Sequence, residues 1–299
     1  MTQPNNYGFE EEAVMLKDSA RRFFGEKLPI DQLHAMIAAD PSPERSPEVI
    51  WPETLWPEMV ALGWTALAVP ESAGGIGLPW VAVAGLLEEA GRAALPSPLL
   101  STLQATAVLA HTGAAGEAAL AEIAEGCAVT LACMDVAGSQ QAGAVTVVDG
   151  HLQGQAYYVQ DVGKCDRLLV LARDGDETAL FWVAMDSEGV TVHRDAIVDL
   201  TRDQARISFD GVAGQRIDGD GTVAWRAAQP AIWTMISADM VGAAEWQLQT
   251  TTEYAQQRKQ FDRPLGFFQA IKHQLVDTMI AIDESKSLVY SAACALDHE

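Results

Sequence analysis

The stretch that decides the fold reads EYAQQRKQF at residues 253–261 and FQAIKHQLVD at residues 268–277. From 254 to 273 it carries four cationic side chains against one acidic side chain, although the whole chain has 41 acidic and 19 basic residues. A guanidinium forks onto phosphate oxygens and an aromatic ring offers a flat apolar face. The stretch therefore indicates a site for a phosphate-bearing cofactor or, since cations often end helices, a helix C-terminus capped by Arg258 and Lys259.

Two long helices are predicted around this stretch, from Trp233 to Gln257 and from Phe267 to Leu296. The chain ends inside the second one, with no Gly or other stop signal after it. Two antiparallel helices rarely form a domain alone, because each must cover its apolar stripe. We therefore expect them to pack on the first helical region, on a partner chain, or on helices that this sequence does not show.

The middle of the chain has a different sequence pattern. From Val129 onward, short β-prone runs alternate with Gly and Asp turns, at residues 145–148, 168–171, 179–185 and 205–209. This spacing is typical of an all-β domain, either a sandwich or a barrel. Residues 8 to about 125, by contrast, are rich in Ala and Leu with helical periodicity.

The order α, then β, then α predicts a multidomain α+β protein. We expect an N-terminal helical domain over residues 1–125 and a middle β-barrel or sandwich domain over residues 126–222. A C-terminal helical-bundle domain is expected over residues 223–299, with only its first two helices present.

The composition of the chain excludes several classes of function. Hydrophobic residues make up 49% of the chain and charged residues 20%, which is typical of a globular protein. The formal charge of −22 argues against general nucleic-acid binding, since neutralising phosphates needs clustered Lys and Arg. The N-terminal segment lacks signal-peptide features and no apolar run reaches the roughly 20 residues of a membrane span, so we expect a cytoplasmic protein without membrane contact. The four cysteines and six histidines show no metal-binding spacing, so no metal site is predicted.

Two further segments, VPESAGGIGL at residues 69–78 and LEEAGR at residues 87–92, complete the pattern. Together with the stretch at 253–277, they resemble the acyl-CoA dehydrogenase family over essentially the whole chain. The resemblance implies an FAD flavin between the β domain and the C-terminal helices, and an acyl-CoA substrate. In that family a carboxylate removes the α-proton, hydride leaves the β-carbon for the flavin, and electrons pass to an electron-transferring flavoprotein. The family is commonly a tetramer in which each flavin also touches a neighbouring subunit.

The resemblance implies cofactor roles for four residues of the C-terminal region. Arg258 and Phe261 fall where the family holds the adenine and pyrophosphate end of FAD, typically across the subunit interface. Phe268 and Gln269 match a second pair that contacts the cofactor. Asp262 stands where the family usually has Gly.

The β region departs further from the family pattern. The family uses the hydroxyl and backbone amides of a loop that reads Thr-Glu-Pro, two residues, then Gly-Ser-Asp, and here only Gly138 and Ser139 survive. The family's Trp-Ile-Thr or Trp-Ile-Ser, which packs on the flavin, is replaced by a segment containing Tyr158 and Gln160. We predict a weakened flavin pocket, with Tyr158 either a flavin contact or simply a strand core residue.

No residue of this chain is predicted to be the catalytic base. Most family members carry the catalytic Glu near the C-terminus, beyond residue 299, and a minority place it about ten residues ahead of the position of Gly242. That second slot holds Ile232, followed by Trp233, and neither removes a proton. Asp239 and Glu245 lie on the same helix at spacings that place them on other faces.

Three hypotheses follow from the resemblance. The first is one subunit of a heteromeric, steroid-degradation-type acyl-CoA dehydrogenase, such as a heterotetramer, whose Arg258 arm serves FAD bound mainly by a homologous partner. The second is an ordinary homotetramer whose catalytic Glu lies in a segment absent from this sequence. The third is a non-catalytic scaffold subunit of the same fold.

Overall fold

The computed structural model describes residues 6–38, 51–139 and 144–298. The chain divides into two compact units, each made of separate stretches. Unit 1 contains residues 1–32, 79–95 and 233–299, and unit 2 contains residues 33–78 and 96–232. Two helices run from one unit into the other, α2 (Ile30–Ile37) and α7 (Gly221–Gln257).

Unit 1 is helical. Besides the second part of α7, it contains α1 (Glu11–Lys27), α4 (Trp80–Arg92) and α8 (Gln269–His298). Acidic residues occupy the first turn of α1 and Lys27 its last turn, which complements the helix dipole. The N-terminus of α4 is capped from far along the sequence, because the Asp297 carboxylate accepts hydrogen bonds from the backbone N–H groups of Trp80 at 2.6 Å and Val81 at 3.1 Å.

Helix α4 is the core of unit 1, and two glycines allow it to approach α7 closely. A Cβ at Gly91 would lie 1.9 Å from the Asp239 carbonyl oxygen, and a Cβ at Gly242 would lie 1.8 Å from the Glu88 carbonyl oxygen. Any larger side chain at either position would separate the helices. The LEEAGR segment is therefore a packing motif as well as a family signature.

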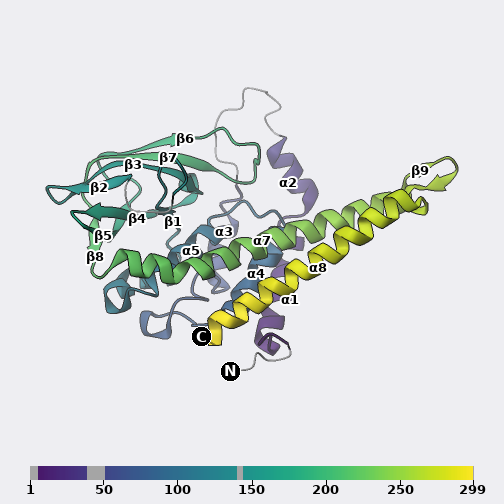
Figure 1. Cartoon of the computed structure of the whole chain (residues 1–299), viewed down its shortest axis with the longest axis horizontal. Helices are drawn as coiled ribbons and strands as arrows, with labels where there is room; N and C mark the ends of the chain where they lie inside the picture. The colour runs from purple at the N-terminus through teal and green to yellow at the C-terminus, as the bar shows by residue number, and fades with distance from the viewer. Residues whose placement is uncertain (1–5, 39–50, 140–143, 299) are drawn as a thin grey trace. The chain divides into compact units, whose positions relative to one another are not determined.

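Helices α7 and α8 run side by side to a hairpin, where β9 (Lys259–Gln260) pairs with β10 (Arg263–Pro264) (Figure 1). A short 3-10 turn, η4 (Leu265–Phe267), leads into α8. The two long helices predicted from the sequence are thus present.

Unit 2 begins with short helices. These are α3 (Leu55–Ala61), α5 (Leu99–Leu109) and α6 (Glu117–Ala124), with the 3-10 turns η1 (Glu71–Ala73) and η2 (Gly113–Gly116). Helix α5 is buried along nearly its whole length, so it serves as a core helix. The first part of α7 completes the helical part of this unit.

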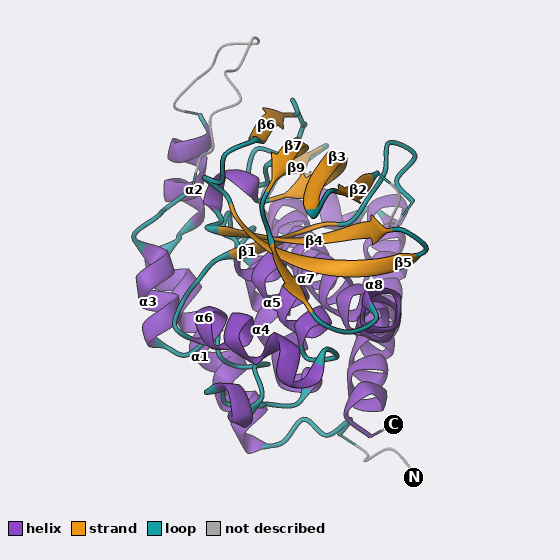
Figure 2. Ribbon diagram, turned by 90° about the vertical axis from the view of Figure 1, so that its left-hand side faces the viewer, coloured by secondary structure: helices purple, strands orange, loops and turns teal. Residues whose placement is uncertain are grey.

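An eight-stranded sheet follows, shown in orange in Figure 2. The strands are β1 (Val129–Ala132), β2 (Val145–Val148), β3 (His151–Gln160), β4 (Arg167–Asp174), β5 (Glu177–Ala184), β6 (Val190–Arg194), β7 (Gln204–Val212) and β8 (Gln215–Ile217). Their order is β6-β7-β3-β2-β4-β5-β8, and β1 pairs in parallel with β4. The 3-10 turn η3 (Val162–Lys164) connects β3 to β4. The predicted succession of helical, β and helical regions is confirmed.

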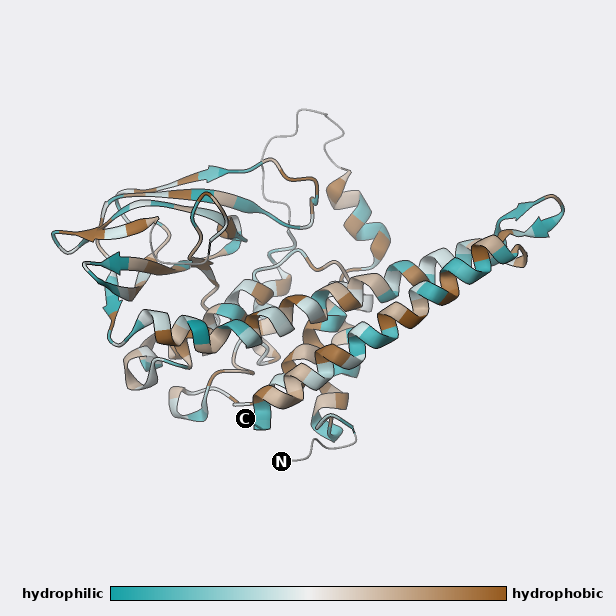
Figure 3. Cartoon of the chain, viewed as in Figure 1, coloured by the Kyte–Doolittle hydropathy of each residue, from teal (hydrophilic) through white to brown (hydrophobic). Residues whose placement is uncertain are grey.

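Alternation along the strands builds the core of the β region. In β3, Leu152, Ala156 and Val159 are buried while their neighbours are more exposed, as expected when one face of a strand is packed. Figure 3 shows apolar segments inside the sheet and also along α7 and α8 toward β9. Among the described residues, no helix has both the length and the apolar character needed to cross a membrane.

Candidate functional site

The tip of the α7–α8 hairpin brings four predicted cofactor residues into one short segment. Arg258 directly follows the last residue of α7, Phe261 lies in the turn, and Phe268 and Gln269 lead into α8. The rings of Phe261 and Phe268 meet edge to face, with centroids 6.2 Å apart and an interplanar angle of 85°. The Arg258 backbone is fixed on both sides, because its N–H donates to the Tyr254 carbonyl and its own carbonyl accepts from the Leu265 N–H, both at 2.8 Å.

The turn between β9 and β10 is strained. Phe261 has φ of 53° and Asp262 has φ of 58°, the left-handed conformation at both central residues that a two-residue hairpin turn requires. Asn or Gly normally occupies such positions, and a bulky side chain there is an outlier that costs about 1–3 kcal/mol. Phe261 is nevertheless 86% exposed, so burial within this chain does not offset the strain. A strained and exposed aromatic residue is typical of a recognition site.

The charges at the tip are available for a ligand. The Arg258 side chain is exposed and forms no hydrogen bond or ion pair with any residue that the structure describes. Arg258 lies directly after the last residue of α7, so the alternative interpretation, in which Arg258 and Lys259 complement the helix dipole, stays a prediction beside that of a cofactor contact. Arg263 lies over the Phe267 ring, with its guanidinium carbon 5.0 Å from the ring centroid, and holds the base of the hairpin in place.

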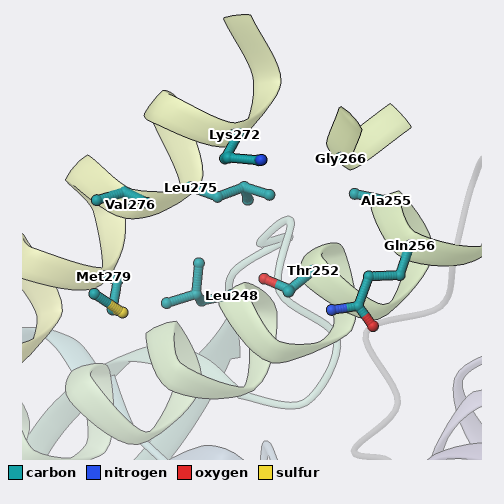
Figure 4. Close-up of a pocket in the computed structure, with 9 residues that line it drawn as sticks. All are labelled: Leu248, Thr252, Ala255, Gln256, Gly266, Lys272, Leu275, Val276 and Met279. Carbon is teal, nitrogen blue, oxygen red and sulfur yellow. The ribbon is translucent and has the colours of Figure 1, made fainter. Parts of the chain in front are cut away.

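A groove lies between α7 and α8 next to the tip (Figure 4). Its volume is about 250 Å³ and its lining is mostly apolar. From α7 and η4 it is lined by Leu248, Thr252, Ala255, Gln256 and Gly266, and from α8 by Lys272, Leu275, Val276 and Met279. Sequence reasoning missed this groove, although the three- and four-residue spacing of these positions on each helix was a usable signal.

In unit 2, Tyr158 and Gln160 lie at the end of β3. The Tyr158 backbone is left-handed, with φ of 56°, at an irregularity in the pairing of β3 with β7. Tyr158 is 40% exposed, so the interpretation of Tyr158 as a strand core residue is wrong. Its hydroxyl donates to the Val136 carbonyl at 3.0 Å. The Gln160 amide nitrogen donates to the Tyr158 carbonyl at 3.1 Å and to the Gln204 side-chain oxygen at 2.8 Å, which uses both of its N–H groups.

Gly138 and Ser139 lie in a turn that is closed by Asp135. The Asp135 carboxylate accepts from the backbone N–H of Ala137 at 2.8 Å and of Ser139 at 2.9 Å. Gly138 has φ of 75°, which its lack of a side chain permits, and its N–H donates to the Asp135 carbonyl. The backbone amides that this loop would offer to a flavin are therefore bonded to Asp135 instead.

A buried charge cluster fixes the segment that follows Gln160. Lys164 lies 2.8 Å from the Asp161 carboxylate and 2.9 Å from the Asp203 carboxylate, and the Ser101 hydroxyl on α5 donates to Asp161 at 2.6 Å. Burial raises the pKa of Asp161, although Lys164 opposes this effect. Burial alone would lower the pKa of Lys164, but the two carboxylates outweigh it and raise that pKa. The ammonium of Lys164 is thus held charged in the interior.

A second buried network joins the helices of unit 1, and sequence reasoning gave it no role. Glu88 on α4 lies 2.7 Å from the Lys17 ammonium on α1 and 2.8 Å from the Lys286 ammonium on α8, and it accepts from the Tyr290 hydroxyl. Its neighbour Glu89 receives two hydrogen bonds from Arg21, at 2.8 and 3.0 Å. Paired acids in LEEAGR were the visible signal, but their cationic partners come from segments far away in the sequence.

This network also bears on the search for a base. Glu245 lies 2.6 Å from Lys286 and 3.7 Å from Arg92, so its carboxylate belongs to an ion-pair network. Ile232 is buried and Trp233 is exposed, and neither side chain accepts a proton. That this chain contributes no base stays a prediction. Among the described residues, no cluster of His, Cys, Asp and Glu has the arrangement of a metal site.

We compared the chain with models of protein families and with known proteins. The family models "Acyl-CoA dehydrogenase, N-terminal domain" and "Acyl-CoA dehydrogenase, C-terminal domain" match residues 10–127 and 234–299. Acyl-CoA dehydrogenase IpdE2 of Mycobacterium tuberculosis (strain ATCC 25618 / H37Rv) is 29% identical over 285 residues, which cover 95% of this chain and 76% of that protein.

Two solved structures share the architecture. A variant of the Tcur3481-Tcur3483 steroid ACAD has a TM-score of 0.83 and 32% identity, with 95% of this chain and 78% of that chain covered. The ChsE4-ChsE5 complex from Mycobacterium tuberculosis has a TM-score of 0.81 and 25% identity, with 96% of this chain and 78% of that chain covered.

Proposed function

Because this chain belongs to the acyl-CoA dehydrogenase family, whose cofactor is FAD, we propose that it is one subunit of a heteromeric enzyme that dehydrogenates acyl-CoA thioesters. The observation that carries the proposal is a contrast between two parts of the chain. The arm at the tip of the α7–α8 hairpin has a free guanidinium and exposed aromatic rings. The donors near Tyr158 are already bonded within the chain.

The arm fits the phosphate end of FAD. Arg258 presents a fork of N–H donors that matches phosphate oxygens, and it has no internal partner to give up among the described residues. Phe261 and Phe268 offer ring faces and edges for the adenine. Gln269, at the first turn of α8, adds an amide next to a helix N-terminus.

The β region offers the flavin ring fewer unbonded hydrogen-bond donors than the arm offers the phosphates. The Gln160 amide and the backbone N–H groups of Ala137 and Ser139 would each have to break an existing hydrogen bond before donating to a flavin. The exposed side chain of Tyr158 offers a flat apolar face on which a flavin of the assembled enzyme can stack. We therefore assign the main FAD site to a homologous partner and the arm of this chain to that partner's cofactor.

When bound, the flavin supplies the hydride acceptor for the β-carbon, and a carboxylate of another chain or segment removes the α-proton. The part of this chain is to hold and orient the cofactor. Electrons are expected to pass on to an electron-transferring flavoprotein, as in the rest of the family.

A steroid-derived acyl-CoA is our proposed substrate. It is supported by the 32% identity with a protein described as a steroid ACAD. Comparing turnover of a steroid acyl-CoA with that of octanoyl-CoA, with an artificial electron acceptor, tests this assignment. Faster turnover of octanoyl-CoA would argue against it.

The central experiment purifies the 299-residue chain alone and after co-expression with a homologous subunit. The chain alone is expected to retain little flavin, and the complex is expected to be yellow and active. Arg258→Ala should weaken FAD retention by the complex about tenfold or more, since a charge-assisted hydrogen bond contributes about 1.5–3 kcal/mol. Arg22→Ala, the same change at an exposed arginine of α1, is the control and should have no effect. Full flavin occupancy and turnover by this chain alone would refute the proposal.

A further inference from the structure

Strand β3 contains a β-bulge at Tyr157 and Tyr158. Its pairing with β7 shifts register between Ala156 and Val159, so the two tyrosines lie opposite one residue of β7, Arg206. Tyr158 has the left-handed backbone conformation, with φ of 56°. A bulky residue is strained there, and such strain persists only where the surrounding structure enforces it.

The bulge decides which of two neighbouring side chains is buried. Val159 lies opposite Ala205 in the core and is 1% exposed, whereas Tyr158 is 40% exposed. In a regular pairing Tyr158 would take the place opposite Ala205, because a slip of one residue turns each side chain to the other face of the sheet. Tyr and Val are both common in strands, so residue type alone specifies this register weakly.

The pairing beyond the bulge is short. In the part of the chain that the structure describes, β3 pairs with β7 there through Val159 and Gln160 alone. The backbone N–H of Asp161 adds one hydrogen bond, to the Asp203 carbonyl at 2.9 Å. Each such bond adds little net stability, so this short ladder resists a slip weakly and needs another element to fix its register.

The buried charge cluster at the end of β3 is suited to fix it. The Lys164 ammonium joins Asp161, which directly follows β3, to Asp203, which directly precedes β7. The Asp203 carboxylate also accepts from the Gly163 N–H at 2.9 Å, and the Ser101 hydroxyl of α5 donates to Asp161 at 2.6 Å. The cluster therefore holds the end of β3 to the start of β7 and to α5.

A buried ion cluster is a costly way to stabilise a fold. Taking charges out of water costs free energy that their mutual attraction regains only in part, and apolar residues of similar volume often stabilise a core as well. The best-attested use of buried polar groups is to select one register among several. Burial alone would lower the pKa of Lys164, but Asp161 and Asp203 outweigh it, so the ammonium stays charged and keeps both carboxylates.

We propose that Lys164 is a positioning residue, whose buried charge cluster locks the register beyond the β-bulge and so holds Tyr158 on the exposed side of β3. The register lock is a property of this chain alone. Its effect on the enzyme rests on the proposed function, because the exposed Tyr158 side chain is the face on which we expect a flavin to stack. Lys164 thus acts on the cofactor through Tyr158.

The first test measures the register in the full chain by hydroxyl-radical footprinting with mass spectrometry. A triple variant, Lys164→Met with Asp161→Asn and Asp203→Asn, removes the three charges and nearly keeps the size of each side chain. The ratio of oxidation at Tyr158 to oxidation at Tyr157 should fall about threefold or more, because a slip buries Tyr158 and leaves Tyr157 on its present side. An unchanged ratio in the folded triple variant would overturn the proposal.

The matched control removes another cluster of one cation and two carboxylates from the same sheet. Arg216 of β8 pairs with Asp174 and Glu177, and their side chains are exposed or half-exposed. Arg216→Met with Asp174→Asn and Glu177→Gln should leave the oxidation ratio unchanged. An equal fall in this control would show that any loss of charge from the sheet moves the tyrosine, and would overturn the lock.

A milder variant covers the case in which the triple variant loses its far-UV circular dichroism. Asp203→Asn keeps an oxygen for the Gly163 N–H but no longer attracts Lys164. It should lower the oxidation ratio in the same direction by a smaller factor. A wild-type ratio in this folded variant would then count against the lock.

The second test is a double-mutant cycle on FAD retention by the complex with the homologous subunit. The triple variant and Tyr158→Ala should each weaken retention about fivefold or more, and their combination should be no weaker than Tyr158→Ala alone. Independent losses that multiply would show a general structural role and overturn the positioning role of Lys164. If Tyr158→Ala leaves retention unchanged, the flavin contact of the proposed function fails and with it the effect of Lys164 on the cofactor, whereas the oxidation ratio decides the register lock separately.

Discussion

Replacing Glu88 by glutamine is expected to lower the free energy of unfolding of unit 1 by about 3 kcal/mol. The substitution keeps the size of the side chain and an acceptor for the Tyr290 hydroxyl, but it removes the charge between Lys17 and Lys286. Breaking one partner of a buried ion pair costs about 3–5 kcal/mol. We expect the lower end, because Lys286 keeps Glu245 at 2.6 Å and Lys17 keeps a more distant carboxylate, that of Glu89, at 3.9 Å.

The assay is native-state hydrogen exchange followed by mass spectrometry, because it reports on each region separately. Since 1.4 kcal/mol corresponds to a tenfold change, peptides from α4 and α8 should exchange about 100-fold faster in Glu88→Gln. Peptides from β4 and β5 serve as the internal reference and should be unchanged. Glu122→Gln is the control, since its partner Arg167 at 3.2 Å is partly exposed and such pairs contribute at most about 1 kcal/mol. A change below about threefold in α4 and α8 would refute the reasoning.

The same variant has a defined pH dependence. Burial alone would raise the pKa of Glu88, but the Lys17 ammonium, with hydrogen bonds from Lys286 and Tyr290, outweighs it and lowers that pKa. The folded pKa then lies below the unfolded value of about 4.3, so the stabilisation is complete above that pH and is lost as the pH falls through the folded pKa. The difference between wild type and Glu88→Gln should therefore be full at pH 7 and shrink below about pH 4. A difference that stays constant down to pH 3 would contradict the assigned cause.

Three other predictions concern packing, capping and thiol chemistry. Gly242→Ala should destabilise unit 1 by more than about 3 kcal/mol in urea unfolding, because its Cβ would lie 1.8 Å from the Glu88 carbonyl oxygen; an unchanged midpoint would show that α4 and α7 separate easily. Asp297→Ala should cost about 1 kcal/mol by removing the cap of α4, measured in the same way, and Asp297→Asn should recover part of it. Burial raises the pKa of the Cys133 thiol to about 12, so Ellman's reagent should label it at pH 8 only after denaturation; rapid labelling of the native chain at Cys133 would contradict this environment.

Much of the fold follows from local sequence pattern. Helix α4 lies in the Ala- and Leu-rich region of helical periodicity at residues 8 to about 125, and the β-prone runs at residues 145–148 and 205–209 lie in β2 and β7. These elements are set by periodicity and by Gly and Pro near their ends, which are properties of neighbouring residues. Strand β3 is not among the predicted β-prone runs, although one interpretation placed Tyr158 in a strand, because Gly154, Gln155 and Gln160 weaken its β character and its pairing with β7 stabilises it instead.

In the candidate site, too, some features were indicated by the sequence and others were shown only by the structure. The resemblance of EYAQQRKQF to the family pattern implied cofactor roles for Arg258 and Phe261, and their assignment remains a proposal. The sequence did not indicate that Phe261 would be strained and exposed, that Gln160 would already use both its N–H groups, or that Glu88 would meet Lys17 and Lys286. Each of these depends on groups that are distant along the chain and near in space.

The sequence by itself therefore determined the family, the order of helical and β regions, and the basic segment in an acidic chain, because these are matters of residue type and spacing. Only the tertiary structure decided which donors are already bonded within the chain and which side chains line the groove between α7 and α8. The physical reason is that hydrogen bonds and burial depend on pairs of residues, and the partner of Glu88 or of Gln160 is chosen by the packing of helices and strands. The same packing brings Lys272 and Leu248, 24 residues apart in the sequence, to one groove.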